Sequence, residues 1–84
     1  METLTLYAYI ERRIKGKRTD SVVQDLIDDM ALDREIPGMT GSQIVTHIVW
    51  NGCSEAVDAL VTFVKSYKQY CRAHGYKPEA LPSI

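Results

Sequence analysis

Residues 54–74 read SEAVDALVTFVKSYKQYCRAH and carry the longest helical pattern in the chain. Apolar side chains recur here every three or four residues, which places them on one face of an α-helix. They are Ala56, Ala59, Leu60, Phe63, Val64, Tyr67, Tyr70 and Cys71. Ser54 can cap the first turn, and Gly75 suits the left-handed backbone that follows a helix end. Such a helix spans roughly 30 Å, so we expect the shorter apolar segments to pack against it.

Length and composition predict one small globular domain. The sequence has 84 residues, of which 45% are hydrophobic and 25% charged, and these are ordinary values for a soluble protein. No apolar run reaches the roughly 18 residues that a membrane helix needs, and the first residues lack the apolar core of a signal peptide. We therefore expect a cytoplasmic protein without membrane contact. Its helical domain should cover residues 1–75, and residues 76–84 should form a short tail, with an ordered turn around Tyr76 and then a frayed end.

Two shorter helical patterns precede the long one. Residues 3–15 form the first and stop at Gly16, and the second begins near Ser21, whose hydroxyl has capping-box spacing to Gln24. The apolar sides consist of Leu6, Tyr9, Ile10 and Ile14 in the first pattern and of Val22, Val23, Leu26, Ile27 and Met30 in the second. Residues 33–41 then connect to the next segment and should bury Ile36 under the loop.

The segment QIVTHIVWN, residues 43–51, is less regular. Its β-branched residues and the dipeptide Asn51-Gly52 are typical of a hairpin. A strand would need a partner, however, and the strongest helix of the chain follows directly. We therefore predict a third helix, capped by Thr40 or Ser42. Together these patterns predict an all-α fold, a compact bundle of four to five short helices built on the long C-terminal helix.

The residues suited to metal binding or catalysis are few. Cys71 and His74 can reach one ion from a single helix, but His47 and Cys53 have the spacing of no common zinc half-site. Both cysteines are expected to be lone thiols and small core residues. The acidic residues between Asp25 and Glu35 lack the glycine-centred loop of a calcium site. No nucleophile elbow, phosphate-binding glycine loop or zincin motif occurs. We therefore expect a non-enzymatic protein that uses no metal or cofactor.

Charged residues define two candidate binding surfaces. The basic candidates lie at the ends of the first and last helices and are Arg12, Arg13, Lys15, Lys17, Arg18, Lys65, Lys68 and Arg72. The acidic candidates lie opposite the apolar side of the second helix and are Asp25, Asp28 and Asp29. The basic residues also complement the negative ends of their own helices. A net charge of −1 gives no long-range attraction to a polyanion.

These surfaces allow two classes of function. The acidic surface favours a protein-binding module that contacts a protein partner or a second copy of the chain. The alternative is a DNA- or RNA-binding module that uses the basic helix ends, which would neutralise phosphates if they lay together. We expect the protein-binding module, because three aspartates on one helix have no use in binding nucleic acid.

Several residues also follow the pattern of a known family. The family pattern begins with an aromatic pair before a basic segment and continues with a polar or acidic helix start. It then has an Asp-x-x-Phe-Pro element, an isoleucine before a Tyr-Leu pair, and a final Phe-x-x-x-Trp-x-x-Tyr motif. In this sequence they correspond to Tyr7 and Tyr9, to Asp20 and Ser21, to Asp33 through Pro37, to Ile44 with His47 and Ile48, and to Phe63, Tyr67 and Tyr70.

On these motifs, from Leu6 to Tyr70, the chain resembles the YozE-like family of small proteins from Gram-positive bacteria. The resemblance implies a SAM-like bundle of four or five short helices. It brings no established activity and no catalytic residue. The chain departs from the pattern at Leu6, Ile36, His47 and Tyr67, where the family has Phe, Phe, Tyr and Trp.

Overall fold

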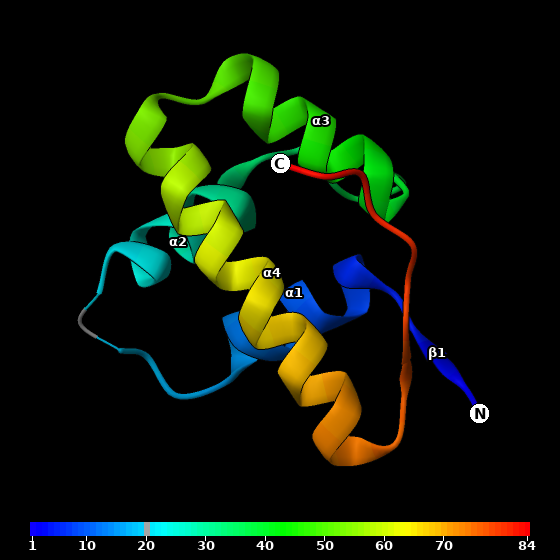
Figure 1. Cartoon of the computed structure of the whole chain (residues 1–84). Coiled ribbons are helices and arrows are strands. Elements are labelled where there is room, and N and C mark those ends of the chain that lie inside the picture. The colour runs from blue at the N-terminus through cyan, green and yellow to red at the C-terminus, as the bar shows by residue number, and fades with distance from the viewer. Residues whose placement is uncertain (20) are drawn as a thin grey trace.

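The computed structural model describes residues 1–19 and 21–84, so Asp20, matched above to the family pattern, lies outside the described residues. Along the chain the elements are β1 (Thr3–Leu4), α1 (Leu6–Lys15), α2 (Val22–Leu32), α3 (Gly41–Asn51), α4 (Ser54–His74) and β2 (Lys77–Pro78) (Figure 1). The predicted all-α fold on a long C-terminal helix is confirmed. Within the described part of the chain, no helix is both long and apolar enough to cross a lipid bilayer.

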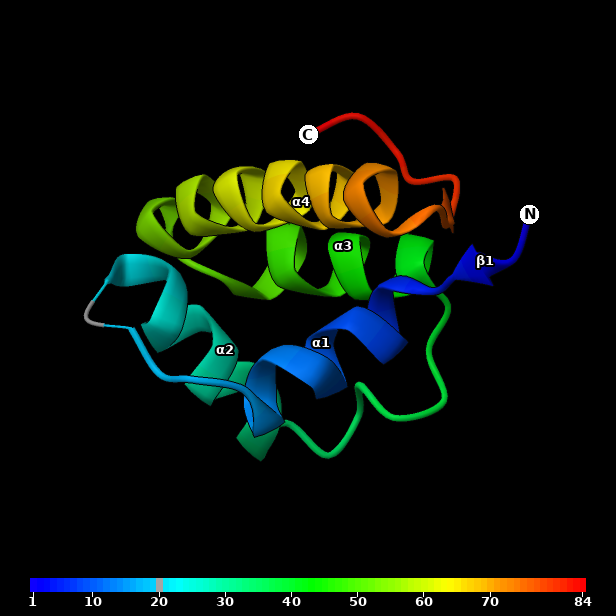
Figure 2. The same ribbon diagram turned by 90° about the horizontal axis from the view of Figure 1, so that it is seen from below.

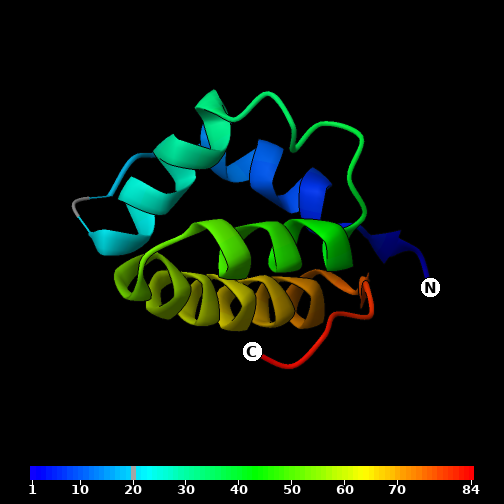
Figure 3. The ribbon, with the colours of Figure 1, turned by 90° about the horizontal axis from the view of Figure 1, so that it is seen from above.

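Helix α4 supports the rest of the fold. It lies on one side of the molecule with α3 beside it, while α1 and α2 lie on the other side (Figure 2 and Figure 3). Leu60 and Phe63 are fully buried, as their place in the apolar stripe predicts. The ring of Tyr9 from α1 packs on α4, with its centroid 5.2 Å from that of Phe63 and 5.4 Å from that of Tyr67. The core is therefore a cluster of aromatic and aliphatic side chains between the two sides.

Local signals set most of the helix ends. The hydroxyl of Ser21 accepts a hydrogen bond from the amide of Gln24, and Thr40 forms a complete capping box with Gln43. Gly75 adopts the predicted left-handed backbone, with φ of 74°. These three helix ends agree with the sequence.

Other details of the helices differ from the expectation. The residue before α4 is Cys53, whose side chain forms no capping hydrogen bond, and Ser54 is already helical. Helix α1 begins at Leu6 rather than at residue 3, because the preceding residues pair with β2. Ile14 and Val22, which belong to the predicted apolar sides, are 41% and 59% exposed. Both lie at the ends of short helices, where the neighbouring helices no longer cover them.

The segment after Gly75 differs from the frayed tail expected there. Strand β2 pairs in parallel with β1, so that Lys77 lies opposite Thr3. The buried hydroxyl of Tyr67 donates to the carbonyl of Leu4 and accepts from the amide of Glu79 at 2.6 Å. Backbone groups of both chain ends are thus satisfied by one another and by α4, which holds the tail against the domain.

Candidate functional site

Arg12, one of the predicted basic residues, lies among tyrosines. Its guanidinium donates to the hydroxyl of Tyr70 at 2.8 Å and to that of Tyr76 at 3.4 Å, and it lies over both rings. The hydrogen bonds to Tyr76 and Tyr70 raise the pKa of Arg12. This contact joins the last turns of α1 to the carboxyl end of α4.

Arg13 and Arg18 also bind within the chain. Arg13 donates to the hydroxyl of Tyr9 at 2.9 Å and lies over the ring of Phe63. Arg18 forms a bidentate ion pair with Asp28, with both N–O distances at 2.8 Å. That pair joins one residue of the predicted basic surface to one residue of the predicted acidic surface, so the two surfaces meet there.

The remaining cations fall into two groups. Lys68 and Arg72 line a hollow of about 340 Å³ together with Tyr76, the residue that also holds Arg12. Lys65 lies one turn earlier on α4. Lys15 and Lys17 are exposed, and neither lines this hollow. The structure therefore brings part of the basic set together around Tyr76 and leaves Lys15 and Lys17 outside it (the arrangement of α1 and α4 is seen in Figure 2 and Figure 3).

The three predicted acidic residues lie on α2 in different surroundings. Asp28 accepts from Arg18 and from the side-chain amide of Gln24, and these hydrogen bonds lower its pKa. Asp25 and Asp29 are exposed. Asp29 also borders a cavity of about 170 Å³ whose lining includes Asp33 and His47.

Trp50, the single tryptophan of the chain, is not among the site residues predicted from the sequence. It lies on α3 with its surface 81% exposed. Between Glu35 and Glu55 the sequence contains no Asp, Glu, Lys or Arg, although such residues make up 25% of the chain. The core of a protein interface is typically depleted of charge and enriched in aromatic residues. A charge-free segment with a tryptophan opposite the apolar face of its helix was the signal that could have identified this surface.

A groove runs along the outer side of α3 and has a volume of about 410 Å³. Its two walls are rows of side chains four residues apart. One row is Ser42, Thr46 and Trp50, and the other is Gln43, His47 and Asn51. Rows with this spacing are the ridges that fit between the side chains of a neighbouring helix. The opposite face of α3 packs into the core, so this groove has the geometry of a helix-packing surface open to solvent.

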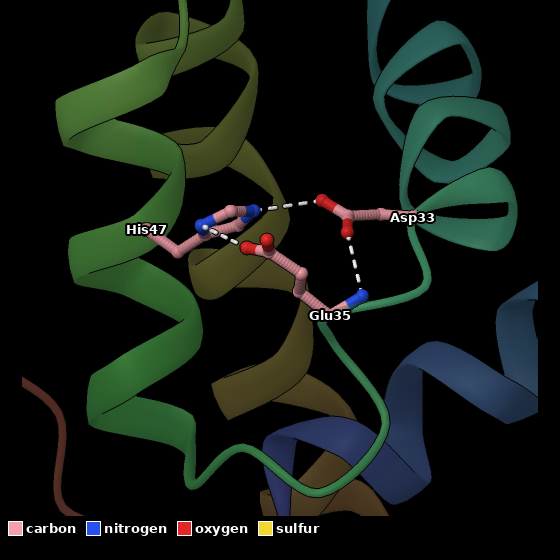
Figure 4. Close-up of side chains that lie close together, drawn as sticks. All are labelled: Asp33, Glu35 and His47. Atoms are coloured by element: carbon pink, nitrogen blue, oxygen red, sulfur yellow. Dashed lines mark hydrogen bonds and ion pairs between the residues drawn. The ribbon is translucent and has the colours of Figure 1, made fainter.

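His47, in one wall of the groove, connects α3 to the segment after α2 (Figure 4). Its Nε2 lies 2.7 Å from Oδ2 of Asp33, and its Nδ1 lies 3.6 Å from Oε2 of Glu35. The other oxygen of Asp33 accepts the backbone N–H of Glu35 at 2.9 Å. Hydrogen bonds from the Glu35 amide and from His47 lower the pKa of Asp33. The cluster fixes the loop to α3, which positions one wall of the groove.

The same three side chains are the candidate metal ligands among the residues that the structure places. Asp33, Glu35 and His47 each offer an atom within 4.8 Å of the others. Both ring nitrogens of His47 already have partners in the chain, since Asp33 faces Nε2 and the amide of Asn51 lies 3.2 Å from Nδ1. An ion would have to replace one of these contacts, so the arrangement fits a hydrogen-bonded cluster better than a metal site.

The two cysteines cannot share one metal ion. Cys71 is fully buried in the core, as expected, whereas Cys53 is exposed, so the expectation of two core thiols is wrong for Cys53. The two residues lie at opposite ends of α4, roughly 27 Å apart at 1.5 Å per residue. One ion therefore cannot contact both thiols.

No family model, curated protein or solved structure matches this chain. The resemblance to the YozE-like family therefore stays a prediction from the sequence motifs, and so does the SAM-like description of the bundle.

Proposed function

We propose that this protein is a non-enzymatic protein-binding module whose contact surface is the outer face of α3. The observation that carries the proposal is the exposure of Trp50 on a segment without charged residues. Tryptophan is among the residues that dominate binding energies at protein interfaces. A groove beside such a residue accepts an amphipathic helix in one of the common modes of peptide recognition. We also propose a cytoplasmic location, which suits the exposed free thiol of Cys53.

Burial of Trp50 by a partner would remove a large apolar surface from contact with water. A tryptophan side chain buries roughly 150–250 Å², which corresponds to a gross gain of about 4–6 kcal/mol at 25 cal/mol per Å². The fold itself does not use this gain, because Ile44, Val45 and Ile48 supply the buried face of α3. Trp50 is therefore available for a partner without loss of stability.

Photo-crosslinking tests this proposal. A photoreactive amino acid is placed at position 50 and, as a matched control, at position 14, where Ile14 is also an exposed apolar residue on a helix. We expect protein adducts from position 50 in the organism's own cells, and fewer from position 14. Thr46→Lys in the same chain should suppress the adducts, because it places a charge in the groove. Equal labelling at both positions, or none at position 50, would contradict the proposal.

A second candidate function is DNA or RNA binding at the cations around Tyr76. Arg12, Lys68 and Arg72 gather there without an acidic residue in the lining of the hollow. Against it, Arg12 is already bound by two tyrosines, and the net charge is −1. We expect binding to a DNA duplex no tighter than roughly 10 µM at physiological salt. Sub-micromolar binding that Lys68→Glu and Arg72→Glu abolish would favour this candidate instead.

A further inference from the structure

We infer that the groove between α2 and the first half of α4 binds a basic segment of a partner protein, which places an apolar side chain in the groove and lysines or arginines beside its walls. This α2–α4 groove shares no lining residue with the groove along α3. The inference therefore goes beyond the proposed function, because it assigns a second contact surface. It rests on the shape of the groove, on its apolar lining and on its charge.

The α2–α4 groove consists of two adjoining hollows, of about 110 and 380 Å³. Val22, Glu55 and Ala59 line both hollows, so the two are continuous. The start of α2 lies beside the start of α4, as Figure 2 shows. From Cys53 to Thr62 the groove extends roughly 14 Å along α4. Two to three turns of a partner helix, at about 5.4 Å per turn, would cover this length.

The lining of the groove offers an apolar contact. Ala56 and Ala59 are small residues on α4, so a partner side chain can approach the helix closely there. Leu26 lies beneath them in the core and is buried, whereas Val22 is 59% exposed. Covering Val22 with an apolar side chain removes surface of both partners from water, which favours binding.

Every charged side chain in this lining is acidic. The four residues are Asp25 and Asp29 on α2 and Glu55 and Asp58 on α4. All four are exposed. Among the described residues, no lysine or arginine lines either hollow, and the ion pairs involve other carboxylates. The groove is therefore complementary to a positively charged partner.

The two helix ends at the groove do not balance this charge. The amino-terminal end of a helix carries roughly half a positive charge. The ends of α2 and α4 together thus offset about one of the four carboxylates and leave an excess of about three negative charges. Repulsion among like charges opposes the compact state, and the cations of a partner would relieve it.

The spacing of the carboxylates favours several cations over one metal ion. In the part of the chain that the structure describes, the cluster with three potential ligand atoms within 4.8 Å of one another is Asp33, Glu35 and His47. None of these lines the α2–α4 groove. The four groove carboxylates are therefore spread out. Lysines or arginines three and four residues apart on a partner helix could each reach a different one.

The cations of this chain are placed elsewhere. Arg18 attracts Asp25, but its ion pair is with Asp28, which lines neither hollow. Lys68 and Arg72 line a hollow at the other end of α4. Since a hollow cannot enter a groove, these residues do not make a second copy of the chain a fitting occupant. The groove therefore suits a separate protein with a protruding basic segment.

A peptide titration measures this binding. The probe is a fluorescent, amphipathic helical peptide of about 14 residues, or roughly 21 Å, with leucines on one side and lysines on the other. We expect a dissociation constant of about 10–100 µM at low salt, because the groove is shorter than a standard interface. Binding should weaken several-fold at about 200 mM salt. No binding below about 1 mM overturns the inference.

Two control peptides separate the contributions of charge and apolar contact. With glutamate in place of lysine, the peptide should not bind. With serine in place of leucine, it should bind at least about fivefold more weakly. Equal binding of the serine peptide overturns the apolar contact, and binding of the glutamate peptide overturns the charge complementarity.

A pair of double variants places the binding site. Asp29→Asn with Asp58→Asn changes the groove, and Glu2→Gln with Glu11→Gln changes carboxylates outside it. Each pair raises the net charge by two, from −1 to +1. The groove pair should weaken peptide binding about three- to tenfold, and the control pair less than about twofold. Melting curves verify that both are folded. Equal losses in the two pairs overturn the groove as the site.

Single variants test the apolar lining in the same assay. Val22→Thr replaces an exposed methyl group of the groove by a hydroxyl and should weaken binding of the leucine–lysine peptide. Ile14→Thr is the matched control, since Ile14 is also exposed but lies outside the groove. The control should bind like the parent. A larger loss in Ile14→Thr than in Val22→Thr overturns the placement of the apolar contact.

Two further readouts separate the alternatives. In sedimentation equilibrium the protein alone should remain at 9.5 kDa. A dimer that the groove pair dissociates would overturn a separate protein as the occupant. Crosslinking from position 50 tests the proposed function independently. Adducts there without groove-dependent peptide binding overturn this inference alone, and peptide binding without adducts overturns the proposed function alone.

Discussion

Gly41 has no side chain, and the carboxylate of Glu79 occupies the space that a Cβ atom at position 41 would fill. The amide of Gly41 donates to Oε2 of Glu79 at 2.9 Å, and a Cβ atom on Gly41 would lie 2.5 Å from Oε1. Oε1 also accepts the amide of Leu6 at 2.9 Å. One carboxylate thus binds the amino-terminal ends of α1 and α3, where the helix dipoles favour negative charge. The tail thereby becomes part of the fold.

Glu79→Ala should destabilise the domain by about 1–3 kcal/mol, because it leaves two helix ends without their acceptor. Urea denaturation followed by circular dichroism measures the change. Ser83→Ala, in the same tail and exposed, is the control and should have no effect. Equal stability of Glu79→Ala and the parent would show that the tail does not contribute to folding.

Gly41→Ala should also be destabilising, although alanine in place of glycine ordinarily stabilises a helix by up to about 1 kcal/mol. The added methyl group displaces Glu79 and the side chain of Leu81, which would lie 2.7 Å from it. In a Glu79→Ala background the main obstacle is gone, so the same change should cost less or become stabilising. A double-mutant cycle measures this coupling, and additive effects would exclude the contact.

Tyr67 should make stability depend on pH in alkaline solution. Burial raises the pKa of Tyr67 to about 12 from its ordinary 10.0. The folded state therefore disfavours the phenolate, so the contribution of Tyr67 is complete below pH 10.0 and is lost as the pH rises toward 12. The stability difference between the parent and Tyr67→Phe should change over that interval, while the other tyrosines affect both proteins alike. A constant difference from pH 9 to 12 would argue against this role.

Phe63→Ala should cost about 3–5 kcal/mol, since the side chain is fully buried and its ring packs 5.2 Å from that of Tyr9. So large a loss unfolds a substantial fraction of a small domain. Thermal unfolding measures it, with Thr62→Ala at the adjacent exposed position as the control. An unchanged melting curve would refute α4 as the centre of the core.

The two thiols should differ sharply in reactivity. Cys53 is exposed, whereas Cys71 is fully buried and its burial raises its pKa. A thiol reagent should modify Cys53 at once and Cys71 only in denaturant, as mass spectrometry of the labelled peptides would record. Reductant and chelator should leave the melting temperature unchanged. Rapid labelling of Cys71 in the native protein would contradict its placement in the core.

The sequence by itself determined the helices, because helix signals act within one or two turns. The periodicity of residues 54–74, the cap at Ser21 and the left-handed Gly75 each depend on neighbours only a few residues away. The burial of Phe63 and Leu60 followed from the same periodicity. The basic and acidic candidates could likewise be named from the sequence, as residue types on helical faces.

Tertiary structure alone decided which of those residues meet. The contacts of Arg12 with Tyr70 and of Leu6 with Glu79 join residues 58 and 73 positions apart, and no local pattern encodes such pairs. Residues 76–84 have no helical periodicity, and for that reason a frayed tail is expected from the sequence. In the structure, their backbone and one carboxylate form hydrogen bonds with groups of α1, α3 and α4 that would otherwise lack a partner within the chain. Trp50 lies outside the core for a similar reason. Packing of α3 on α4 buries Ile44, Val45 and Ile48, which leaves the other side of the helix, with its groove, facing solvent.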